Sequence, residues 1–151
     1  YGYNPNGYHP NVRFDGTPLK PVMTLKSKVS YFKVCPPSTG ISYNHSFITD
    51  RQTRIVTLPV GYGDGYCRLF SNRGEVIIGH KRYPVVGTIC MDQTMVDIGP
   101  DGTAYNGDDV LLFGEMEGEV IPLESLCERI GTITYEVLCG ISSRVPRIYL
   151  S

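Results

Sequence analysis

An excess of charge of either sign is missing from this sequence. Its 151 residues carry 14 lysines and arginines against 15 aspartates and glutamates. A nucleic-acid-binding domain usually shows a basic excess on one face, so the balance argues against that class. Runs of the roughly 18 apolar residues that a membrane span needs are missing too. The first ten residues, YGYNPNGYHP, lack the basic start and the apolar stretch of a signal peptide. We therefore expect no nucleic-acid or membrane partner and a cytoplasmic location.

The sequence also lacks cysteines and histidines at the spacing of a zinc site. The chain has an odd number of cysteines, no C-x-x-C pair, and 3 histidines that do not cluster with the cysteines. We expect no zinc site and a set of reduced thiols. Three of the cysteines lie in apolar strings, where they are expected to pack as small hydrophobic side chains: Cys90, Cys127 and Cys139.

Tryptophan is absent, whereas 17 glycines and 11 prolines are spread along the chain. This distribution is typical of a fold with many turns. Between Met23 and Tyr31, apolar and polar residues alternate with the period of a half-buried strand. Pro59 and Pro84 lie inside two further apolar runs, which predicts edge or bulged strands there. Strands are predicted over residues 54–60, 75–79, 83–87, 88–98, 109–114 and 119–121.

The C-terminal part has a different pattern. Apolar residues at the i, i+3, i+4, i+7 spacing predict a helix over 122–131. A second short helix is predicted over 132–141, with Thr132 or Thr134 as its cap, and a final strand over 145–150. Residues 1–20 are loop-like and precede a domain that spans 21–151. The expected fold is mainly β: an antiparallel, Greek-key-like barrel or sandwich with about two short helices near the C-terminus.

Four segments contain residues that could carry chemistry. Tyr43 lies in the turn-rich segment 40–45, where a phenol can serve as acid or base, although an ordinary surface tyrosine is the commoner case. Glycines alternate with tyrosines over 60–68, which fits a tight turn or a backbone that approaches a ligand. Polar residues interrupt an apolar strand at 90–93, as in a bulge or an anion site. The segment 131–136 fits a capped helix or a phosphate site.

In order, these segments resemble the C-terminal domain of alanine racemase, an enzyme that uses pyridoxal 5'-phosphate (PLP). The resemblance covers roughly residues 18–150, and its short motifs occur in the family's order. The matching segments are 21–27, 40–43, 58–66, 87–93, 107–110, 132–138 and 144–149.

The resemblance implies an isomerase larger than this chain. In the family, an N-terminal (β/α)8 barrel holds PLP through a lysine, and the β domain packs against the barrel of the other subunit of a homodimer. Residues 1–20 would then be the linker from the missing barrel. The reaction interconverts L- and D-alanine and supplies D-alanine for peptidoglycan. PLP is expected to be absent from this chain because none of its lysines resembles the PLP-binding lysine: Lys20, Lys26, Lys28, Lys33 and Lys81.

The resemblance also assigns catalytic and substrate-binding roles. Tyr43 matches the catalytic tyrosine, which exchanges the Cα proton on the L-alanine face while the barrel lysine serves the D face. Met91 matches the residue whose backbone N–H meets the substrate carboxylate, and Asp92 would support that peptide. These residues would act on the partner subunit's cofactor, so each active site would be shared between chains.

Further matches concern the cofactor and the access channel. Tyr135 matches a tyrosine whose hydroxyl binds the PLP phosphate, again in the shared site. Tyr62 and, with a weaker match, Arg68 correspond to residues that line the channel. Two positions depart from the family pattern. Asn44 stands where many members have Gly, and Asn tolerates the left-handed backbone that this turn needs. Thr88 follows Gly87 where many members have a channel arginine, and the loss of that positive charge changes the electrostatics of access.

Other functions fit the same residues. The enzyme could act on serine or on several small amino acids. A related PLP decarboxylase family fits less well, because its catalytic cysteine segment is not found here. A non-catalytic β module that binds a partner or a small ligand also fits the composition. Such a module should be monomeric, whereas a racemase domain separated from its barrel should self-associate through its exposed interfaces.

We predict that this chain by itself does not racemise alanine, because the barrel and its lysine are missing from it. Incubated with PLP and L-alanine, the chain should form no more D-alanine than a protein-free control, as measured by chiral chromatography. Formation of D-alanine by this chain alone would contradict the division of labour that the resemblance implies.

Overall fold

The computed structural model describes residues 13–14, 17–18 and 21–150. Most of the expected linker, residues 1–20, therefore lies outside the described residues. Within it, β1 (Arg13–Phe14) and β2 (Thr17–Pro18) pair in antiparallel fashion.

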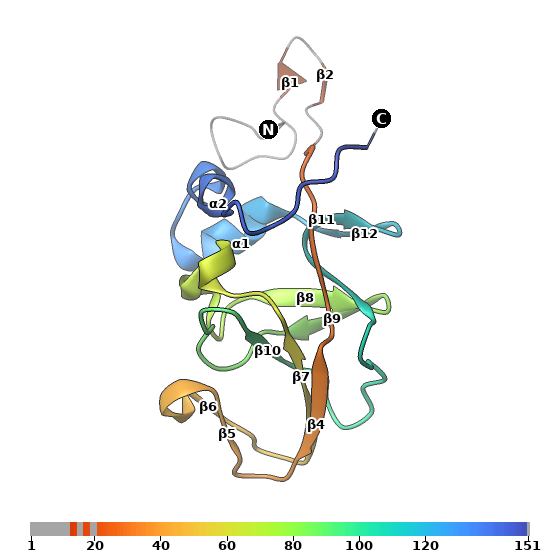
Figure 1. Ribbon diagram of the computed structural model, residues 1–151, viewed down its shortest axis with the longest axis vertical. Helices are drawn as coiled ribbons and strands as arrows, with labels where there is room; N and C mark the ends of the chain where they lie inside the picture. Colours follow the sequence, from red (N-terminus) through yellow and green to blue (C-terminus); the bar gives the residue numbers. More distant parts are fainter. Residues whose placement is uncertain (1–12, 15–16, 19–20, 151) are drawn as a thin grey trace.

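Two antiparallel sheets form the body of the domain (Figure 1). The first sheet has the order β10-β7-β4 and consists of β4 (Tyr31–Cys35), β7 (Thr53–Leu58) and β10 (Thr94–Asp97). The second has the order β12-β11-β8-β9, with β3 also paired to β11. Its strands are β3 (Leu25–Lys28), β8 (Glu75–Ile78), β9 (Lys81–Pro84), β11 (Asp109–Met116) and β12 (Glu119–Ile121). The prediction of a mainly β, antiparallel fold is confirmed, and the sheets do not close into a barrel.

The strand predicted between Met23 and Tyr31 is divided between the two sheets. β3 pairs with β11, and β4 pairs with β7. At the corner, the Val29 N–H donates to the Asp108 carbonyl at 2.9 Å, and the Ser30 N–H donates to the Thr57 carbonyl at 2.9 Å. The chain thus changes sheets without losing backbone hydrogen bonds, as at the corners of other packed β-sheets.

The two prolines have different positions relative to the strands. Pro84 ends β9, which lies at the edge of its sheet as expected. Pro59 follows directly after β7, the central strand of its sheet, so the prediction of an edge strand at 54–60 is wrong. β7 tolerates this proline because the strand ends at Leu58, before an N–H would be missing from the ladder.

Two other predicted strands differ from the structure. In the segment 88–98 only Thr94–Asp97 is a strand, because Cys90 donates its N–H to the Gln93 carbonyl at 2.9 Å and closes a turn. The segment 145–150 forms no strand. There the Arg147 guanidinium donates to carbonyl oxygens just before the segment, those of Ile141 and Ser142, each at 2.9 Å. Residues 148–150 are exposed.

Both predicted helices are present, as α1 (Leu123–Ile130) and α2 (Thr134–Gly140). The spaced apolar residues of α1 are buried, and Gly131 ends the helix with a left-handed φ of 72°. The residue at the N-cap of α2 is Ile133, so the expectation of a Thr132 or Thr134 cap is wrong. The Thr132 hydroxyl instead binds the Glu136 carboxylate.

In the part of the chain that the structure describes, no helix has both the length and the apolar character to cross a membrane.

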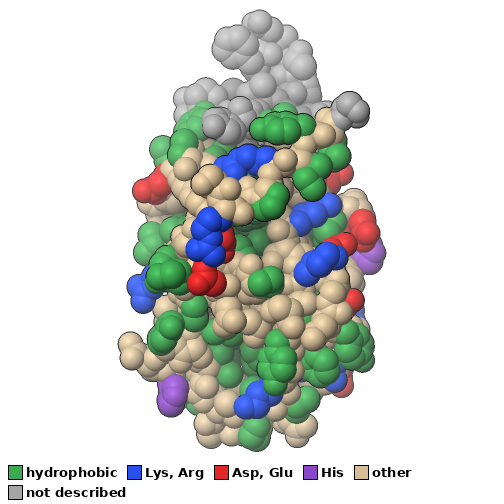
Figure 2. Space-filling model, viewed as in Figure 1, with side chains coloured by type: hydrophobic (Ala, Val, Ile, Leu, Met, Phe, Trp, Pro, Cys, Tyr) green, Lys and Arg blue, Asp and Glu red, His purple; other side chains and the backbone are tan. Residues whose placement is uncertain are grey.

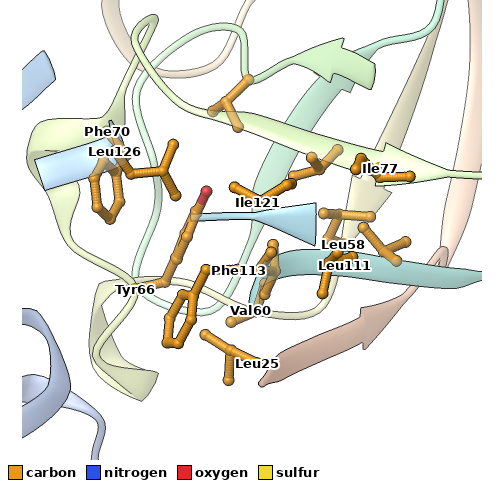
Figure 3. Packing of buried hydrophobic residues seen from close by; sticks show 14 of the residues in the cluster. Leu25, Leu58, Val60, Tyr66, Phe70, Ile77, Leu111, Phe113, Ile121 and Leu126 are labelled. Atoms are coloured by element: carbon orange, nitrogen blue, oxygen red, sulfur yellow. The ribbon is translucent and has the colours of Figure 1, made fainter. Parts of the chain in front are cut away.

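The main core is formed by buried residues of both sheets, of both helices and of the loops between them (Figure 3). It receives Leu111 and Phe113 from β11 and Leu126 from α1, all fully buried. Tyr66 and Phe70 add their rings from the loop that contains η2 (Tyr62–Asp64) and η3 (Arg68–Phe70), with ring centroids 5.2 Å apart. Burial raises the pKa of Tyr66 above its usual range. This loop is therefore anchored in the core by large side chains.

The cysteines differ from one another in burial. All five are free thiols. Cys127 is buried as expected, but Cys90 is only half-buried and Cys139 is exposed, so the expectation of an apolar setting is wrong for Cys139. Cys139 lies on the solvent side of α2, opposite to the buried Val137 and Leu138. Burial raises the pKa of Cys127 to about 12.

We predict that Cys127 resists thiol reagents in the folded protein, whereas Cys139 reacts. At a pH of about 8.5 Cys127 stays protonated and covered, whereas the Cys139 thiol is exposed to the reagent. Mass spectrometry after brief maleimide treatment should find label on Cys139 and none on Cys127. Equal labelling of both thiols without denaturant would contradict this burial.

Candidate active site

Tyr43 lies on a short loop whose backbone is left-handed at several non-glycine residues. Ser42, Asn44 and His45 have φ values of 64°, 56° and 47°. Such residues hold these conformations only where the surroundings fix them. The expectation that Asn44 adopts a left-handed backbone is confirmed. The loop consists of β5 (Gly40–Ile41), η1 (Tyr43–His45) and β6 (Phe47–Ile48).

Hydrogen bonds to the segment 87–90 hold this loop in place. The Ser42 hydroxyl donates to the Thr88 carbonyl at 2.5 Å, and the Ser46 and Thr88 hydroxyls are 2.8 Å apart. A Cβ at Gly87 would lie 2.7 Å from the Ser42 Cβ, so only glycine fits there. Tyr43 itself is 66% exposed. The loop is therefore fixed at its base and presents the phenol outward.

Met91 lies on the turn 90–93, which is paired to the η2 loop through two consecutive peptides. The Tyr62 N–H donates to the Cys90 carbonyl at 3.0 Å, and the Gly63 N–H donates to the Met91 carbonyl at 2.8 Å. A Cβ at Gly61 would lie 2.2 Å from the Cys90 oxygen, which leaves no room for a side chain. Close backbone contact is thus the reason for a glycine at position 61.

This pairing determines the direction of the Met91 N–H. In a planar trans peptide the C=O and the N–H point in opposite directions. The Cys90 C=O points toward Tyr62, so the Met91 N–H of the same peptide points away from the η2 loop. No described residue accepts a hydrogen bond from it, and Met91 is 52% exposed. The turn thus presents a fixed backbone donor that an anionic group can bind.

Charged side chains join the same two loops. The Arg144 guanidinium lies 3.3 Å from the Asp64 carboxylate and 2.5 Å from the Asp92 carboxylate, measured from Nε and Nη2 to Oδ1. The Asp64 carboxylate also accepts the Gly61 N–H at 3.0 Å. Both carboxylates favour the charged guanidinium and raise the pKa of Arg144 above its usual range. Asp92, directly after Met91, thus pairs with a side chain of the C-terminal segment.

The structure brings together three of the residues expected in the site. The Ser42 hydroxyl lies 3.7 Å from the Cys90 sulfur, which joins the Tyr43 loop to the Met91 turn. Tyr62, 43% exposed, starts the η2 loop that pairs with this turn. Figure 2 shows exposed hydrophobic side chains scattered among polar ones on one face, rather than gathered into a single patch.

Tyr135 lies apart from that group, whereas Arg68 lies on the loop that also carries Tyr62. Tyr135 is half-buried in the first turn of α2, and Figure 1 places α2 and the η1 loop at different ends of the molecule. The opposite end of α2 meets the η2 loop, where a Cβ at Gly65 would lie 2.1 Å from the Gly140 oxygen. Arg68 is exposed in η3.

Sequence reasoning missed the roles of Ser42 and Arg144. Ser42 and Arg144 both lie inside motifs that were recognised, but their partners are distant in the chain. Within the described ranges, histidine, cysteine and acidic side chains form no group that could hold a metal ion. The site therefore offers a phenol and a backbone donor on an open β domain.

Comparison with known proteins places this β domain in a family. The family model described as "Alanine racemase, C-terminal domain" matches residues 22–149. The alanine racemase of Clostridium novyi is 50% identical over 147 residues, which cover 95% of this chain and 38% of that protein. The solved alanine racemase of Clostridium difficile 630 has a TM-score of 0.85 and 42% identity, covering 99% of this chain and 38% of that one.

The chain belongs to the alanine racemase C-terminal domain family. It spans little more than a third of the length of the racemases it matches. One solved relative, from Bartonella henselae, contains covalently bound pyridoxal phosphate; it has a TM-score of 0.85 and 34% identity over 99% of this chain and 39% of its own.

We predict that Gly61→Ala destabilises the folded protein by about 2 kcal/mol, because the new Cβ forces apart the paired loops. That Cβ would lie 2.2 Å from the Cys90 oxygen and 2.4 Å from the Met91 oxygen. Urea unfolding measures the loss. Gly140→Ala is the matched control, since its Cβ would lie 3.9 Å from the Gly65 oxygen, an ordinary contact. Similar losses in both variants would show that the close backbone contact is unimportant.

Proposed function

We propose that this chain is the C-terminal domain of a PLP-dependent alanine racemase, which interconverts L- and D-alanine. The observation that supports this most strongly is the neighbourhood of an exposed phenol, Tyr43, and an unused peptide N–H, Met91, on loops that are each fixed by hydrogen bonds. A base and a carboxylate-binding donor on two loops that contact each other fit an amino-acid substrate.

Tyr43 is the base on the L face of the substrate. Racemisation needs a proton acceptor on each face of Cα, because a single fixed base would return the proton to the face it left. The second base is the lysine of the barrel domain. Hydrogen bonds of Ser42 and Ser46 fix the backbone that carries Tyr43, so the phenol reaches the substrate from one side and exchanges the proton on one face of Cα only.

Met91 binds the substrate carboxylate through its backbone N–H. The donor is aimed by the peptide pairing with Tyr62 and Gly63, so its direction is set before the substrate arrives. Tyr62 lies beside it and lines the access channel with Arg68, which restricts the site to small amino acids. The Thr88 hydroxyl is in hydrogen-bond contact with the Ser46 hydroxyl, so Thr88 helps to hold the Tyr43 loop. Because threonine is neutral, this position adds no positive charge to the channel.

PLP, when bound, accepts the electron pair released as the Cα–H bond breaks. Tyr135, in the first turn of α2, would donate its hydroxyl to the phosphate of the cofactor, and the Tyr43 and Met91 loops contain no lysine for the covalent link. The covalent link therefore belongs to the barrel. The relative with covalently bound pyridoxal phosphate supports this assignment.

The remaining parts of the proposal concern the whole protein. Residues 1–20 connect the barrel to the β domain, 21–151. Two chains form a homodimer in which each active site is shared, and the exposed Tyr43, Tyr62 and Met91 side chains are available for that contact. The enzyme acts in the cytoplasm and supplies D-alanine for peptidoglycan. Alanine, rather than serine, is the substrate that the similar racemases support.

We predict that Tyr43→Phe in the full-length protein removes Cα proton exchange from L-alanine far more than from D-alanine. The loss on the L side should be at least about 100-fold, the usual contribution of a general base. Exchange into deuterated water, followed by NMR from each enantiomer separately with PLP present, measures it. Parallel runs with L- and D-serine establish the substrate range.

Tyr31→Phe is the matched control, because Tyr31 is another exposed tyrosine, at 57%, on β4 outside the site. It should exchange both enantiomers like the wild type. If Tyr43→Phe also behaves like the wild type with both enantiomers, Tyr43 is not the base. If the wild type exchanges neither amino acid, the proposed activity is wrong.

A further inference from the structure

Arg144 is an exposed residue that no catalytic role explains, yet it contacts both loops of the substrate-binding region. Its guanidinium touches Asp64 at 3.3 Å and Asp92 at 2.5 Å. Asp64 belongs to the η2 loop that carries Tyr62, and Asp92 follows Met91 directly. One side chain thus connects the loop that lines the site with the turn that presents the backbone donor.

The backbone that carries Arg144 is held to the same loop. The Ser142 N–H donates to the Asp64 carbonyl at 2.9 Å, and the Arg144 N–H donates to the Ser142 hydroxyl at 3.3 Å. A Cβ at Gly63 would lie 2.8 Å from the Arg144 Nη1, so the glycine leaves room for the guanidinium. Arg144 is therefore held beside both loops by its own backbone.

The chemistry of these groups favours arginine. The guanidinium is a planar fork with several donors, so it can bind two carboxylates at once. Without it, Asp64 and Asp92 would leave two unneutralised negative charges beside Met91, where a negatively charged substrate group would approach. A single exposed ion pair contributes little to the free energy of folding, but this side chain contacts a carboxylate on each of the two loops.

We propose that Arg144 is a positioning residue for substrate binding, which clamps Asp64 and Asp92 so that the Met91 N–H keeps its direction and less negative charge faces the substrate carboxylate. This inference rests on the proposed function, because it takes the substrate carboxylate as the ligand of Met91. It predicts that loss of the clamp weakens alanine binding and leaves proton transfer at Tyr43 almost intact.

The test compares three variants of the full-length protein with PLP: Arg144→Gln, Arg144→Lys and the double variant Arg144→Gln, Asp92→Asn. Arg144→Gln should raise KM for alanine about tenfold, the effect of losing one hydrogen bond to a charged group, and change kcat less than about threefold. Arg144→Lys should raise KM less, because it keeps the charge but not the fork. The double variant Arg144→Gln, Asp92→Asn should raise KM no further than Arg144→Gln alone.

Arg51→Gln is the matched control, since Arg51 pairs with its neighbour Asp50 at 3.2 Å outside the site. Its KM should equal that of the wild type. The inference is overturned if folded Arg144→Gln keeps the wild-type KM, if it loses kcat at constant KM, or if Arg51→Gln has the same effect. Thermal unfolding of each variant shows whether it is folded.

A second measurement does not depend on activity. Hydrogen exchange of the Tyr62 and Gly63 amides, which pair with the Met91 turn, should be faster in Arg144→Gln than in Arg51→Gln. Equal exchange rates of these amides in the two variants would overturn the inference that Arg144 holds the two loops together. If the wild type is inactive with alanine, the proposed function fails, and this exchange result still decides whether Arg144 holds the two loops together.

Discussion

The site depends on one backbone contact, the pairing of the Tyr62 and Gly63 N–H groups with the carbonyls of Cys90 and Met91. Two consecutive peptides of one loop are thereby fixed against two consecutive peptides of another. Because each bound carbonyl turns the following N–H the other way, the same contact that joins the loops also presents the donor. The glycine at position 61 is needed because any side chain there would collide with these carbonyls.

The surrounding structure keeps that contact rigid. Tyr66 and Phe70 follow the η2 loop and are buried in the core, so the loop cannot move without opening the core. The Tyr43 loop is held from the other side by the Thr88 carbonyl. Functional side chains on loops that rest on a packed β scaffold are a common arrangement, since the scaffold fixes the loops while their tips stay accessible.

Local patterns predicted many of the elements, because those patterns report burial of a strand or helix face. The spacing of apolar residues predicted α1, and short apolar runs between turns predicted most strands. The errors lie where long-range contacts decide. The corner at Val29 and Ser30 depends on partners near residues 108 and 57. The segment 145–150 alternates like a strand but is held by its own Arg147.

The sequence by itself determined the fold class, the family and the positions of Tyr43, Tyr62 and Met91 within recognisable motifs. Residue types and short spacings carry that information, because they reflect burial and turn chemistry within a few residues. Only the tertiary structure decided that the Met91 N–H has no acceptor among the described residues, which glycines face a carbonyl, and which carboxylates Arg144 joins. Arg144 and Asp92 are separated by 52 positions, and a contact between such distant residues exists only after the sheets and loops have packed.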